Sequence, residues 1–548
     1  LPEFEPFDHA DATPRANPGS PLVVQDVDLS KSMNIANHHT GMYITETLVV
    51  RRGDPIFLKL TFNRPVTAQD NFQVQFRIGQ STFSKVSSIL FSGLVASGPW
   101  EASASEQQGA LMLQVTPAPN AVVGRYRVVV AVALANGLQY TGPELQPSDT
   151  AFLESGHEEY VMNDSGVIWI GSLNSEYPRP WNYGQFEQGV LEACIYIMDK
   201  SQLPISDRGD PVKVVRMASA MINSQDDNGV LVGNWSEDFS MGKSPMFWTG
   251  SVQILQQYHS TGVPVSYAQC WVYAGVLNTF MRCLGLASRV ITNFLSAHDN
   301  DGNLKTDLIF TSDMQPDSRH TRDSIWNYHC WNEVYLRRMD IPEEFSGWQV
   351  IDSTPQETSD GNYRCGPASV KAIKIGKVCF PFDGRFIFAE VNSDVLYHTR
   401  DRYGKLSLQK VDKKLIGQKL VTKSPHGNYQ LDITLEYKYN EGKTWFSPSS
   451  VLRLGMSRDI YRLCIYHVSY LSPQGYVGRP LEAQLDIVNP SGSLLQTQVL
   501  VFVETTYYTG VRSHEVHKEN YNLDLPANSS KTHNILTKKG HLTHREGT

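Results

Sequence analysis

Short runs in which apolar and polar residues alternate fill the chain between residues 40 and 140. They are rich in Val and Phe, and turns that contain Gly, Pro or Asn separate them. The runs read TETLVVRRG, IFLKLTF, FQVQFRIG, GALMLQV and GRYRVVVAVAL. Strands of this length and spacing are typical of an all-β sandwich. We therefore expect a β-sandwich over residues 21–149, after a disordered, proline-punctuated lead-in over residues 1–20.

Helical periodicity replaces this alternation after about residue 150. It is clearest in FEQGVLEACIYIMDK (186–200), in PVKVVRMASAMINS (211–224) and at 268–285, and strand-like runs follow. Helices and strands mixed in one block indicate an α+β domain, which we expect over residues 150–455. Residues 456–548 return to a strand pattern and predict a β domain that stops unfinished. The predicted fold class is therefore multidomain α+β, with a β domain on each side of the mixed one.

Composition and charge narrow the class of protein. The chain has 548 residues and a formal net charge of −8, which gives no reason to expect a nucleic-acid partner. No apolar run reaches the roughly 18 residues that cross a bilayer, and the first residues lack the features of a signal peptide. The seven cysteines include no CxxC pair, which argues against a disulfide framework and a structural zinc site. We expect reduced thiols and a cytoplasmic protein, which could also be externalised without a signal peptide.

Residues 266–285, SYAQCWVYAGVLNTFMRCLG, place a thiol at the start of an almost wholly apolar helix. Because apolar residues cover most of its circumference, we expect this helix to be buried on nearly all sides. Cys270 falls in the first turn, where the positive end of the helix dipole favours a thiolate. Cysteine is also among the residues most often buried for packing alone. This segment by itself leaves both interpretations open.

A thiolate nucleophile needs an imidazole and an orienting carboxylate that lie close in the fold. His329 lies in the strand-like run SIWNYHCWNEVYL (324–336), and Asp352 ends the next strand in GWQVIDSTPQE (347–357). A cysteine helix followed by these two strands is the chain order of papain-like enzymes. In that arrangement Asp352 fixes the tautomer of His329, and His329 holds Cys270 as a thiolate. The agreement of three separate elements favours the interpretation of Cys270 as a nucleophile over a packing role.

The string YAQCWVYAGV closely resembles the active-site signature of the animal, calcium-dependent transglutaminases, usually Tyr-Gly-Gln-Cys-Trp-Val. Ala268 replaces the Gly of that signature, a change that a helix start tolerates. Further matches are WNYGQFE (181–187), NSQDDNGVLVGNW (223–235), RCLGLASRVITNFLSAHDND (282–301), DSIWNYHCWNE (323–333), GWQVIDSTPQETSDGNYRCGPASV (347–370) and FIFAEVNSD (386–394). The resemblance covers most of residues 24–440 and is specific, because a papain-type protease shares only the triad.

The resemblance implies a fold and a set of site residues. The fold is an N-terminal immunoglobulin-like β-sandwich, a papain-like core and a first C-terminal β-barrel, here incomplete and without the second barrel. Cys270, His329 and Asp352 match the catalytic triad. Trp235 matches a tryptophan that stabilises the oxyanion, and Trp326 matches the other wall of the tunnel for the acceptor amine. Tyr508 matches a tyrosine that caps the resting thiol.

The implied reaction is acyl transfer from peptide-bound glutamine, through a cysteine thioester, to a lysine or a small primary amine. Its product is an ε-(γ-glutamyl)lysine cross-link between proteins. The expected partners are protein substrates that carry Gln and Lys and small primary amines, with no nucleic acid and no transmembrane segment; a homodimer is an open alternative. Two other readings remain: a catalytically weak structural member of the family, and a hydrolase acting as glutamine deamidase or cysteine protease. The pair Trp235 and Trp326 favours amine transfer over hydrolysis.

Clustered oxygen ligands suggest calcium at DNDGNLKTD (299–307), where Asp, Asn and Asp side chains recur at short spacing. The run is not an EF-hand, since Leu304 stands where Gly is needed and Phe310 where Glu is needed. A solvated acidic turn is the alternative on composition alone. The resemblance implies three Ca²⁺ sites. The first involves Asp299, Asp301, Asn303, Lys305 and Asp323, the second Ala220, Asn223, Gln225 and Asp227, and the third Asn392, Asp394 and Glu441. At the third site this chain departs from its relatives, because Phe446 stands where they carry another Glu.

Overall fold

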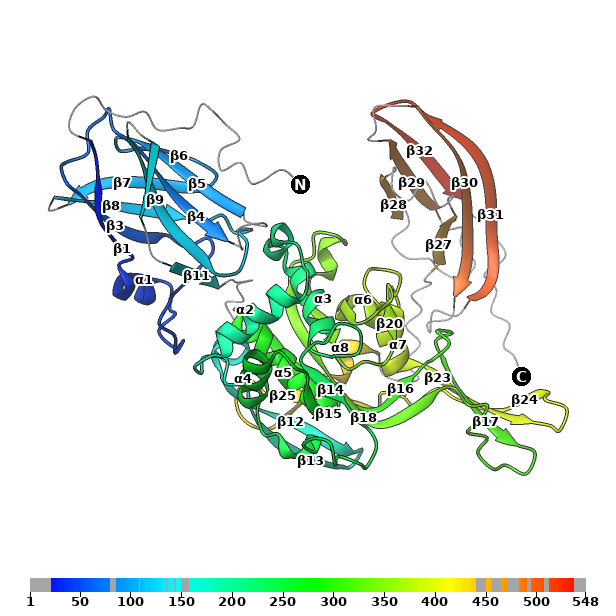
Figure 1. Cartoon of the computed structure of the whole chain (residues 1–548). Helices are drawn as coiled ribbons and strands as arrows, with labels where there is room; N and C mark the ends of the chain where they lie inside the picture. Colours follow the sequence, from blue (N-terminus) through cyan, green and yellow to red (C-terminus); the bar gives the residue numbers. More distant parts are fainter. Residues whose placement is uncertain are drawn as a thin grey trace. The chain divides into compact units, whose positions relative to one another are not determined.

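A computed structural model describes most of the chain (Figure 1). The described residues are 21–78, 85–107, 109–134, 137–141, 144–148, 157–439, 450–455, 465–470, 482–489, 494–506 and 512–536. They fall into two compact units. The first unit comprises Leu1–Asn293, Asn327–Ser369 and Leu420–Ile433, and the second comprises Phe294–Trp326, Val370–Lys419 and Thr434–Thr548. Among the described residues, no helix is long and apolar enough to cross a membrane.

The β-sandwich of the first unit consists of two sheets with an apolar interior, blue in Figure 1. One sheet has the order β1-β3-β8-β7, and the other has the order β2-β11-β9-β4-β5-β6 with β10 paired to β9. The strands are β1 (Val24–Asp28), β2 (Leu48–Arg51), β3 (Ile56–Phe62), β4 (Asn71–Ile78), β5 (Lys85–Ser92), β6 (Val95–Ser97), β7 (Glu101–Gln107), β8 (Ala110–Thr116), β9 (Tyr126–Leu134), β10 (Gly137–Thr141) and β11 (Glu144–Ser148). Along β3 every second side chain is buried, as the alternation in IFLKLTF predicts. The predicted sandwich is therefore confirmed.

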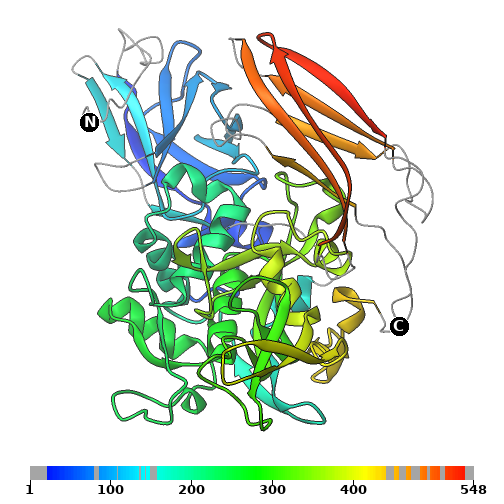
Figure 2. The same cartoon turned by 90° about the vertical axis from the view of Figure 1, so that its right-hand side faces the viewer.

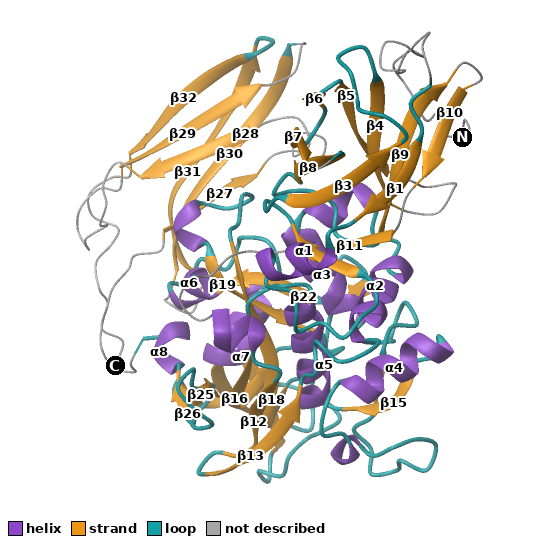
Figure 3. Cartoon of the chain, turned by 90° about the vertical axis from the view of Figure 1, so that its left-hand side faces the viewer, coloured by secondary structure: helices purple, strands orange, loops and turns teal. Residues whose placement is uncertain are grey.

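A six-stranded sheet forms the centre of the mixed α+β region, with strand order β22-β19-β18-β16-β25-β26. Its strands are β16 (Ser288–His298), β18 (Ser324–Leu336), β19 (Gly347–Asp352), β22 (Cys365–Ser369), β25 (Lys419–Lys423) and β26 (Gln430–Asp432). Four helices of the first unit contribute to the same apolar core as β18: α2 (Val190–Lys200), α3 (Pro211–Met221), α4 (Val252–Thr261) and α5 (Cys270–Cys283). Figure 3 shows these helices in purple. The mixture of helices and strands confirms the predicted α+β class.

The helix boundaries differ from the sequence prediction at their ends. The predicted helix 268–285 is α5, which begins at Cys270 because Val265–Ala268 form strand β15 and pair in parallel with β14 (Leu231–Gly233). The nucleophile candidate is therefore the first helical residue. Helix α2 begins four residues later than predicted, and α3 ends three residues earlier.

The second unit contains a three-stranded sheet with the order β17-β23-β24. Its strands are β17 (Lys305–Thr311), β23 (Asp394–Arg400) and β24 (Leu406–Asp412), and the short helices are α6 (Val370–Lys374), α7 (Gly384–Asn392) and α8 (Thr434–Tyr437). Six further strands form the sheets β27-β30-β31 and β28-β29-β32, brown to red in Figure 2. They are β27 (Ser450–Gly455), β28 (Ile465–Tyr470), β29 (Glu482–Asn489), β30 (Leu495–Thr506), β31 (Arg512–Leu525) and β32 (Ser529–Leu536). The expected β character of the C-terminal region is present, and the closure of these strands into a barrel stays a prediction.

Candidate active site

The thiol of Cys270 lies at the N-terminus of α5, where the chain turns from strand to helix. Gln269, with φ −132° and ψ 179°, still has the extended conformation of β15, and its carbonyl accepts the first helical N–H, from Val272, at 2.9 Å. The Gln269 side chain donates to the carbonyl of Asn234 at 3.0 Å, and the Asn234 N–H donates to Ala268. Cys270 is buried, with 7% of its surface exposed. The turn therefore fixes the sulfur in a largely buried position.

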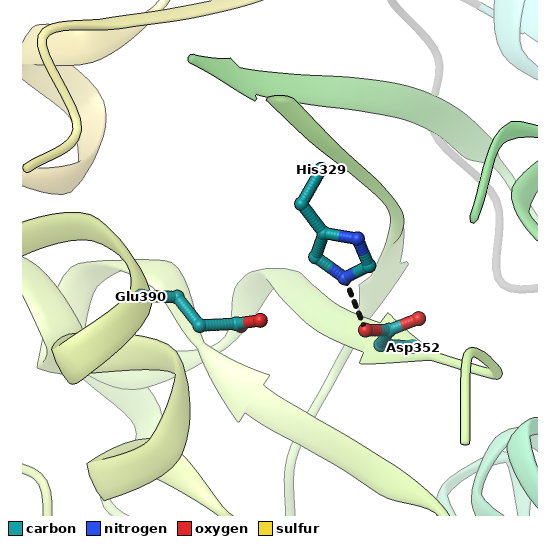
Figure 4. A group of neighbouring side chains, drawn as sticks. All are labelled: His329, Asp352 and Glu390. Atoms are coloured by element: carbon teal, nitrogen blue, oxygen red, sulfur yellow. Dashed lines mark hydrogen bonds and ion pairs between the residues drawn. The ribbon is translucent and has the colours of Figure 1, made fainter. Parts of the chain in front are cut away.

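His329 and Asp352 meet because β18 and β19 pair antiparallel. The register sets Asn332 opposite Ile351, so the end of β19 lies diagonally across from His329. His329 Nε2 and Asp352 Oδ2 are 2.7 Å apart, and both side chains are buried. Figure 4 shows this bond, together with Glu390, a buried carboxylate of α7 in the second unit. The other Asp352 oxygen, Oδ1, accepts the backbone N–H of Thr354 at 2.8 Å, which orients the carboxylate toward the imidazole.

The surroundings of Cys270 favour its thiolate. The pKa of Cys270 is lowered to about 5, first because the Cys330 thiol donates a hydrogen bond to it and then because His329 adds a hydrogen bond and positive charge. Burial works in the opposite direction. It raises the pKa of Cys330 well above its usual value, and the neighbouring Cys270 raises it further. Cys330 therefore stays a neutral donor while Cys270 carries the charge.

Two polar residues of this site were missed from the sequence. Cys330 alternates with His329 along β18, and its neighbour on the same face, Asn332, donates to the Ala274 carbonyl of α5 at 2.9 Å. The position of Cys330 directly after His329 in the sequence was the available signal. The other residue is Gln356, whose amide nitrogen is 3.3 Å from Asp352 Oδ2 and 3.0 Å from His329 Nε2. Nothing in the string STPQE indicated this contact.

The two tryptophans expected to line the amine tunnel belong to different units. Trp235 is 44% exposed, and its ring stacks over Tyr273 on α5 with centroids 6.4 Å apart. Trp326 is 38% exposed and lies on β18, three residues before His329. A shared tunnel between the indoles stays a prediction. Tyr508 lies outside the described residues.

The acidic loop before β17 brings together most of the residues predicted for the first calcium site. Asp323 joins the two ends of this loop: its Oδ1 accepts the N–H of Asn300 at 2.9 Å and its Oδ2 that of Asp307 at 2.7 Å. Asp299 accepts the N–H groups of Gly302, Asn303 and Leu304 at 2.7 to 3.2 Å. Burial raises the pKa of Asp299 to about 6, and repulsion from Asp323 and Asp301 adds to this. Carboxylates that lie this close together repel one another when they are ionised. A bound cation removes this repulsion, so the loop suits a cation.

The remaining predicted ligands lie in two other places. Ala220 lies in the last turn of α3. In the turn after this helix, Asn223 is buried, accepts the N–H of Gln225 at 3.0 Å and donates to the Tyr363 carbonyl at 2.8 Å. Burial, with repulsion from Asp226, raises the pKa of Asp227 to about 6. Two further predicted ligands lie at the junction of α7 and β23, namely Asn392 and Asp394. Lys305 pairs with Asp394 across β17 and β23, so the predicted first and third sites share one sheet. Glu441 lies outside the described residues.

The known proteins that this chain resembles belong to one family. A family model described as "Transglutaminase family" matches residues 25–133, and one described as "Transglutaminase-like superfamily" matches residues 251–353. The chain is 40% identical to human coagulation factor XIII A chain, over 92% of this chain and 73% of that relative. It is also 40% identical to human protein-glutamine gamma-glutamyltransferase K, over 89% of this chain and 63% of that relative, so it spans less than two thirds of the latter protein.

A solved structure agrees with these sequence matches. The crystal structure of red sea bream transglutaminase superposes with a TM-score of 0.70 at 34% identity, over 94% of this chain and 79% of that one. The curated relatives include protein-glutamine gamma-glutamyltransferases from mammals and from the fish Pagrus major. The sequence matches, the superposition and the transglutaminase core together show that this chain belongs to the transglutaminase family, the protein-glutamine gamma-glutamyltransferases.

Proposed function

We propose that this chain transfers the acyl group of a peptide-bound glutamine through Cys270 to a lysine or a small primary amine, in a calcium-dependent manner. The observation that carries the proposal is the thiol of Cys270 at the start of α5, with its pKa lowered to about 5 beside the His329–Asp352 pair. The family relatives are named for this reaction. The residue roles below belong to the proposal.

In the first half-reaction the Cys270 thiolate attacks the carboxamide carbon of the substrate glutamine. Because Asp352 occupies Nε2 of His329, Nδ1 is the nitrogen that remains for the thiol and the substrate. His329 gives its proton to the leaving nitrogen, ammonia departs and a thioester forms. The backbone N–H of Cys270 and the indole N–H of Trp235 are the proposed donors to the oxyanion, and one such donor lowers the barrier by about 3 kcal/mol.

In the second half-reaction an amine attacks the thioester and loses a proton to His329. The Cys270 thiolate then leaves, and an isopeptide bond replaces the thioester. Water competes with the amine for the same carbonyl, and its attack would deamidate the glutamine instead. Aromatic walls at Trp235 and Trp326 would favour an alkylamine over water, since they bind its apolar stem and exclude bulk solvent.

Calcium fits the oxygen-rich residues of the chain. Asp299, Asp301, Asn303 and Asp323, with the backbone of Lys305, would hold one ion, because the buried Asp299 and Asp323 repel each other without it. A second ion would bind through Ala220, Asn223, Gln225 and Asp227, and Asn392 and Asp394 with Glu441 are the third candidate set. When bound, the ion supplies positive charge that neutralises these carboxylates and fixes their loops. Asp323 directly precedes β18, so the conformation of the first loop is coupled through the chain to the strand that carries His329.

The proposed partners are proteins that bear reactive glutamines and lysines, together with small primary amines. We propose a cytoplasmic location and leave a homodimer as an open alternative.

Incorporation of a fluorescent primary amine into a glutamine-rich acceptor protein tests the proposal. The parent chain should incorporate the amine with calcium and lose this activity in EGTA, and Cys270→Ala should be inactive with calcium. Ammonia release without amine incorporation would identify a deamidase instead. An inactive parent that binds calcium and remains folded would support the structural alternative.

A further inference from the structure

The sheet β17-β23-β24 of the second unit has two different faces. Residues directly opposite one another on its paired strands share a face, so the register assigns each side chain to one side. On the first face, Leu308, Val395 and Tyr397 pack in an apolar cluster with Ala297 and Ile416. The second face, which we call the open face, has nine side chains: Asp307, Ile309 and Thr311 of β17, Leu396, His398 and Arg400 of β23, and Leu406, Leu408 and Val411 of β24.

The apolar side chains that β24 gives to the open face are contiguous and reach solvent. Leu406, Leu408 and Val411 are 47%, 54% and 39% exposed. Leu408 and Val411 are three residues apart and would point to opposite faces of a regular strand. A bulge at Gln409 keeps them on one face, because their partners on β23 are only two residues apart. Leu396, directly opposite Val411, continues this apolar surface onto β23.

The hairpin that joins β23 to β24 is basic. Residues 400–414 include six Arg and Lys residues and two Asp residues, a formal net charge of +4 in a chain whose net charge is −8. At the turn, Tyr403 is 78% exposed, and the guanidinium of Arg402 lies 4.7 Å from the centroid of its ring. Figure 1 shows this hairpin extending away from the helices α6, α7 and α8. Cations and an aromatic ring therefore border the exposed leucines.

The acidic groups beside the open face already have partners. Asp307 and Asp317 each lie next to a histidine, at 2.7 and 2.8 Å. Asp401 accepts two backbone N–H groups of the turn, at 2.8 and 2.9 Å. Within the part of the chain that the structure describes, no carboxylate pairs with Arg402 or Lys405. The turn therefore presents its positive charge to an anionic partner.

The size and the chemistry of the open face favour a lipid surface over a protein partner. A stable protein–protein interface takes about 20–30 residues from each side, more than a face of nine residues and one turn provide. Binding to a lipid surface needs fewer residues. Apolar side chains enter the boundary between headgroups and acyl chains, tyrosine lies at the headgroup level, and Lys and Arg are attracted to anionic headgroups.

We propose that the hairpin of β23 and β24 is a docking site for an anionic lipid surface. Leu406 and Leu408 insert at the headgroup boundary, and Tyr403 lies beside them at the headgroup level. Arg402 and Lys405 bind the phosphates and carboxylates of the lipids. Contact of this kind holds a protein at a membrane without a helix that crosses it. The inference does not depend on the proposed acyl transfer, because it uses no residue of the thiol site.

Cosedimentation of the full chain with lipid vesicles tests the proposal. One set of vesicles contains phosphatidylcholine and phosphatidylserine at about 3:1, and the reference set contains phosphatidylcholine alone. The buffer contains EGTA, so that calcium cannot bridge acidic side chains to the lipid. We expect the parent to bind the anionic vesicles about tenfold or more tightly than the neutral ones, and added salt should reduce this difference.

Two double variants separate the apolar contribution from the charged one. Leu406→Ser with Leu408→Ser should lower the affinity for anionic vesicles about tenfold or more, because the burial of two leucines is lost. Arg402→Gln with Lys405→Gln should remove most of the preference for anionic over neutral vesicles. The matched control is Leu435→Ser, which alters a leucine of α8 that is 54% exposed, as Leu408 is. It should bind like the parent.

The altered side chains are all exposed, so each variant should melt within a few degrees of the parent. A parent that stays in the supernatant with anionic vesicles would overturn the inference, and so would a leucine double variant that binds as tightly as the parent. Self-association of the parent in size-exclusion chromatography, lost in the leucine double variant, would also overturn it, because a second copy of the chain would then cover the open face.

Discussion

The sulfur of Cys270 has two neighbours that lower its pKa, and they do so differently. His329 contributes charge and a hydrogen bond, whereas Cys330 contributes a hydrogen bond from a thiol that burial keeps neutral. A hydrogen bond to a charged group is worth about 1.5–3 kcal/mol, which corresponds to one or two pH units. The Cys270 thiolate is therefore stabilised partly by Cys330, whose thiol keeps its own proton.

Replacing Cys330 by alanine should shift the titration of Cys270. In the parent, the pKa of about 5 means that the thiolate forms as pH rises through 5, so alkylation of Cys270 by iodoacetamide should accelerate with that midpoint. In Cys330→Ala the midpoint should rise by one to two units, because the thiolate loses a donor while His329 remains. The rate is measured by mass spectrometry of the peptide that contains Cys270, which separates it from the exposed Cys379.

A matched control is Cys283→Ala, which removes a buried thiol at the other end of α5. It should leave the midpoint near 5. An unchanged midpoint in Cys330→Ala, or an equal shift in both variants, would contradict the assigned role of Cys330.

In the proposed mechanism the Asp352 carboxylate acts on the reaction through the imidazole of His329. Substitution of Asp352 by Asn keeps the size of the side chain but offers Nε2 a neutral partner that no longer fixes the tautomer. We expect kcat for amine incorporation to fall about a thousandfold or more, with little change in melting temperature. A loss smaller than tenfold in a folded variant would show that Gln356, which contacts the same atoms, orients His329 by itself.

At the scale of elements, α5 is buried on every side, and Gly275 shows how closely it is packed. A Cβ built at Gly275 would lie 2.5 Å from Nε1 of Trp181, a residue that is 1% exposed. The Trp181 indole donates to Ser251 Oγ at 2.9 Å, and this hydroxyl donates to the Gly275 carbonyl at 3.1 Å. Close approach of helix and indole therefore requires glycine at this position.

The variant Gly275→Ala should be less stable than the parent, although alanine is the better helix former by about 1 kcal/mol. Overpacking against a buried indole costs typically 1–3 kcal/mol, so we expect a net loss of roughly 1 kcal/mol and a melting temperature lower by a few degrees. Thermal unfolding followed by circular dichroism measures this change in melting temperature. In the background Trp181→Phe, whose ring is smaller, the same change should cost less. A stabilised Gly275→Ala variant would show that propensity outweighs packing here.

The sequence predicted the elements with strong periodicity and missed what depends on contacts between distant segments. The alternation in β3 and the apolar helix α5 were sufficient for the sandwich and for the mixed core. The chain order of Cys270, His329 and Asp352 predicted that they lie close together, and His329 Nε2 is indeed 2.7 Å from Asp352 Oδ2; their catalytic roles stay a prediction. The start of α5 was set two residues too early, because the pairing of β15 with β14 is a tertiary contact that local propensity does not encode. Gln356 was missed for the same reason.

At the scale of the whole molecule, late segments of the chain complete structures that begin early. Strand β25 lies next to β16 in the six-stranded sheet, and Thr422 donates to the Val290 carbonyl at 2.8 Å. Lys423 and Glu159, separated by 264 residues, form an ion pair of 2.7 Å in which both side chains are nearly buried. Within the same unit, Tyr43 donates to the carbonyl of Cys283 at 2.9 Å. The sheet that carries His329 and Asp352 therefore depends on residues beyond position 419.

Truncation before β25 should prevent the sheet from folding, whereas truncation after α8 should not. The fragment 1–439 keeps β25, β26 and α8, whereas 1–417 ends before β25 and loses the fully buried Leu420 and Val421. Each buried aliphatic side chain contributes about 1.5–3 kcal/mol, and removal of the strand also exposes the edge of β16 to other chains. We expect 1–439 to remain monodisperse and to unfold cooperatively, and 1–417 to aggregate. Size-exclusion chromatography and thermal unfolding of both fragments measure this, with Lys423→Met in the full chain as the milder change that removes only the ion pair. If 1–417 were as soluble and as stable as 1–439, the β25 pairing would not be needed for the sheet to fold.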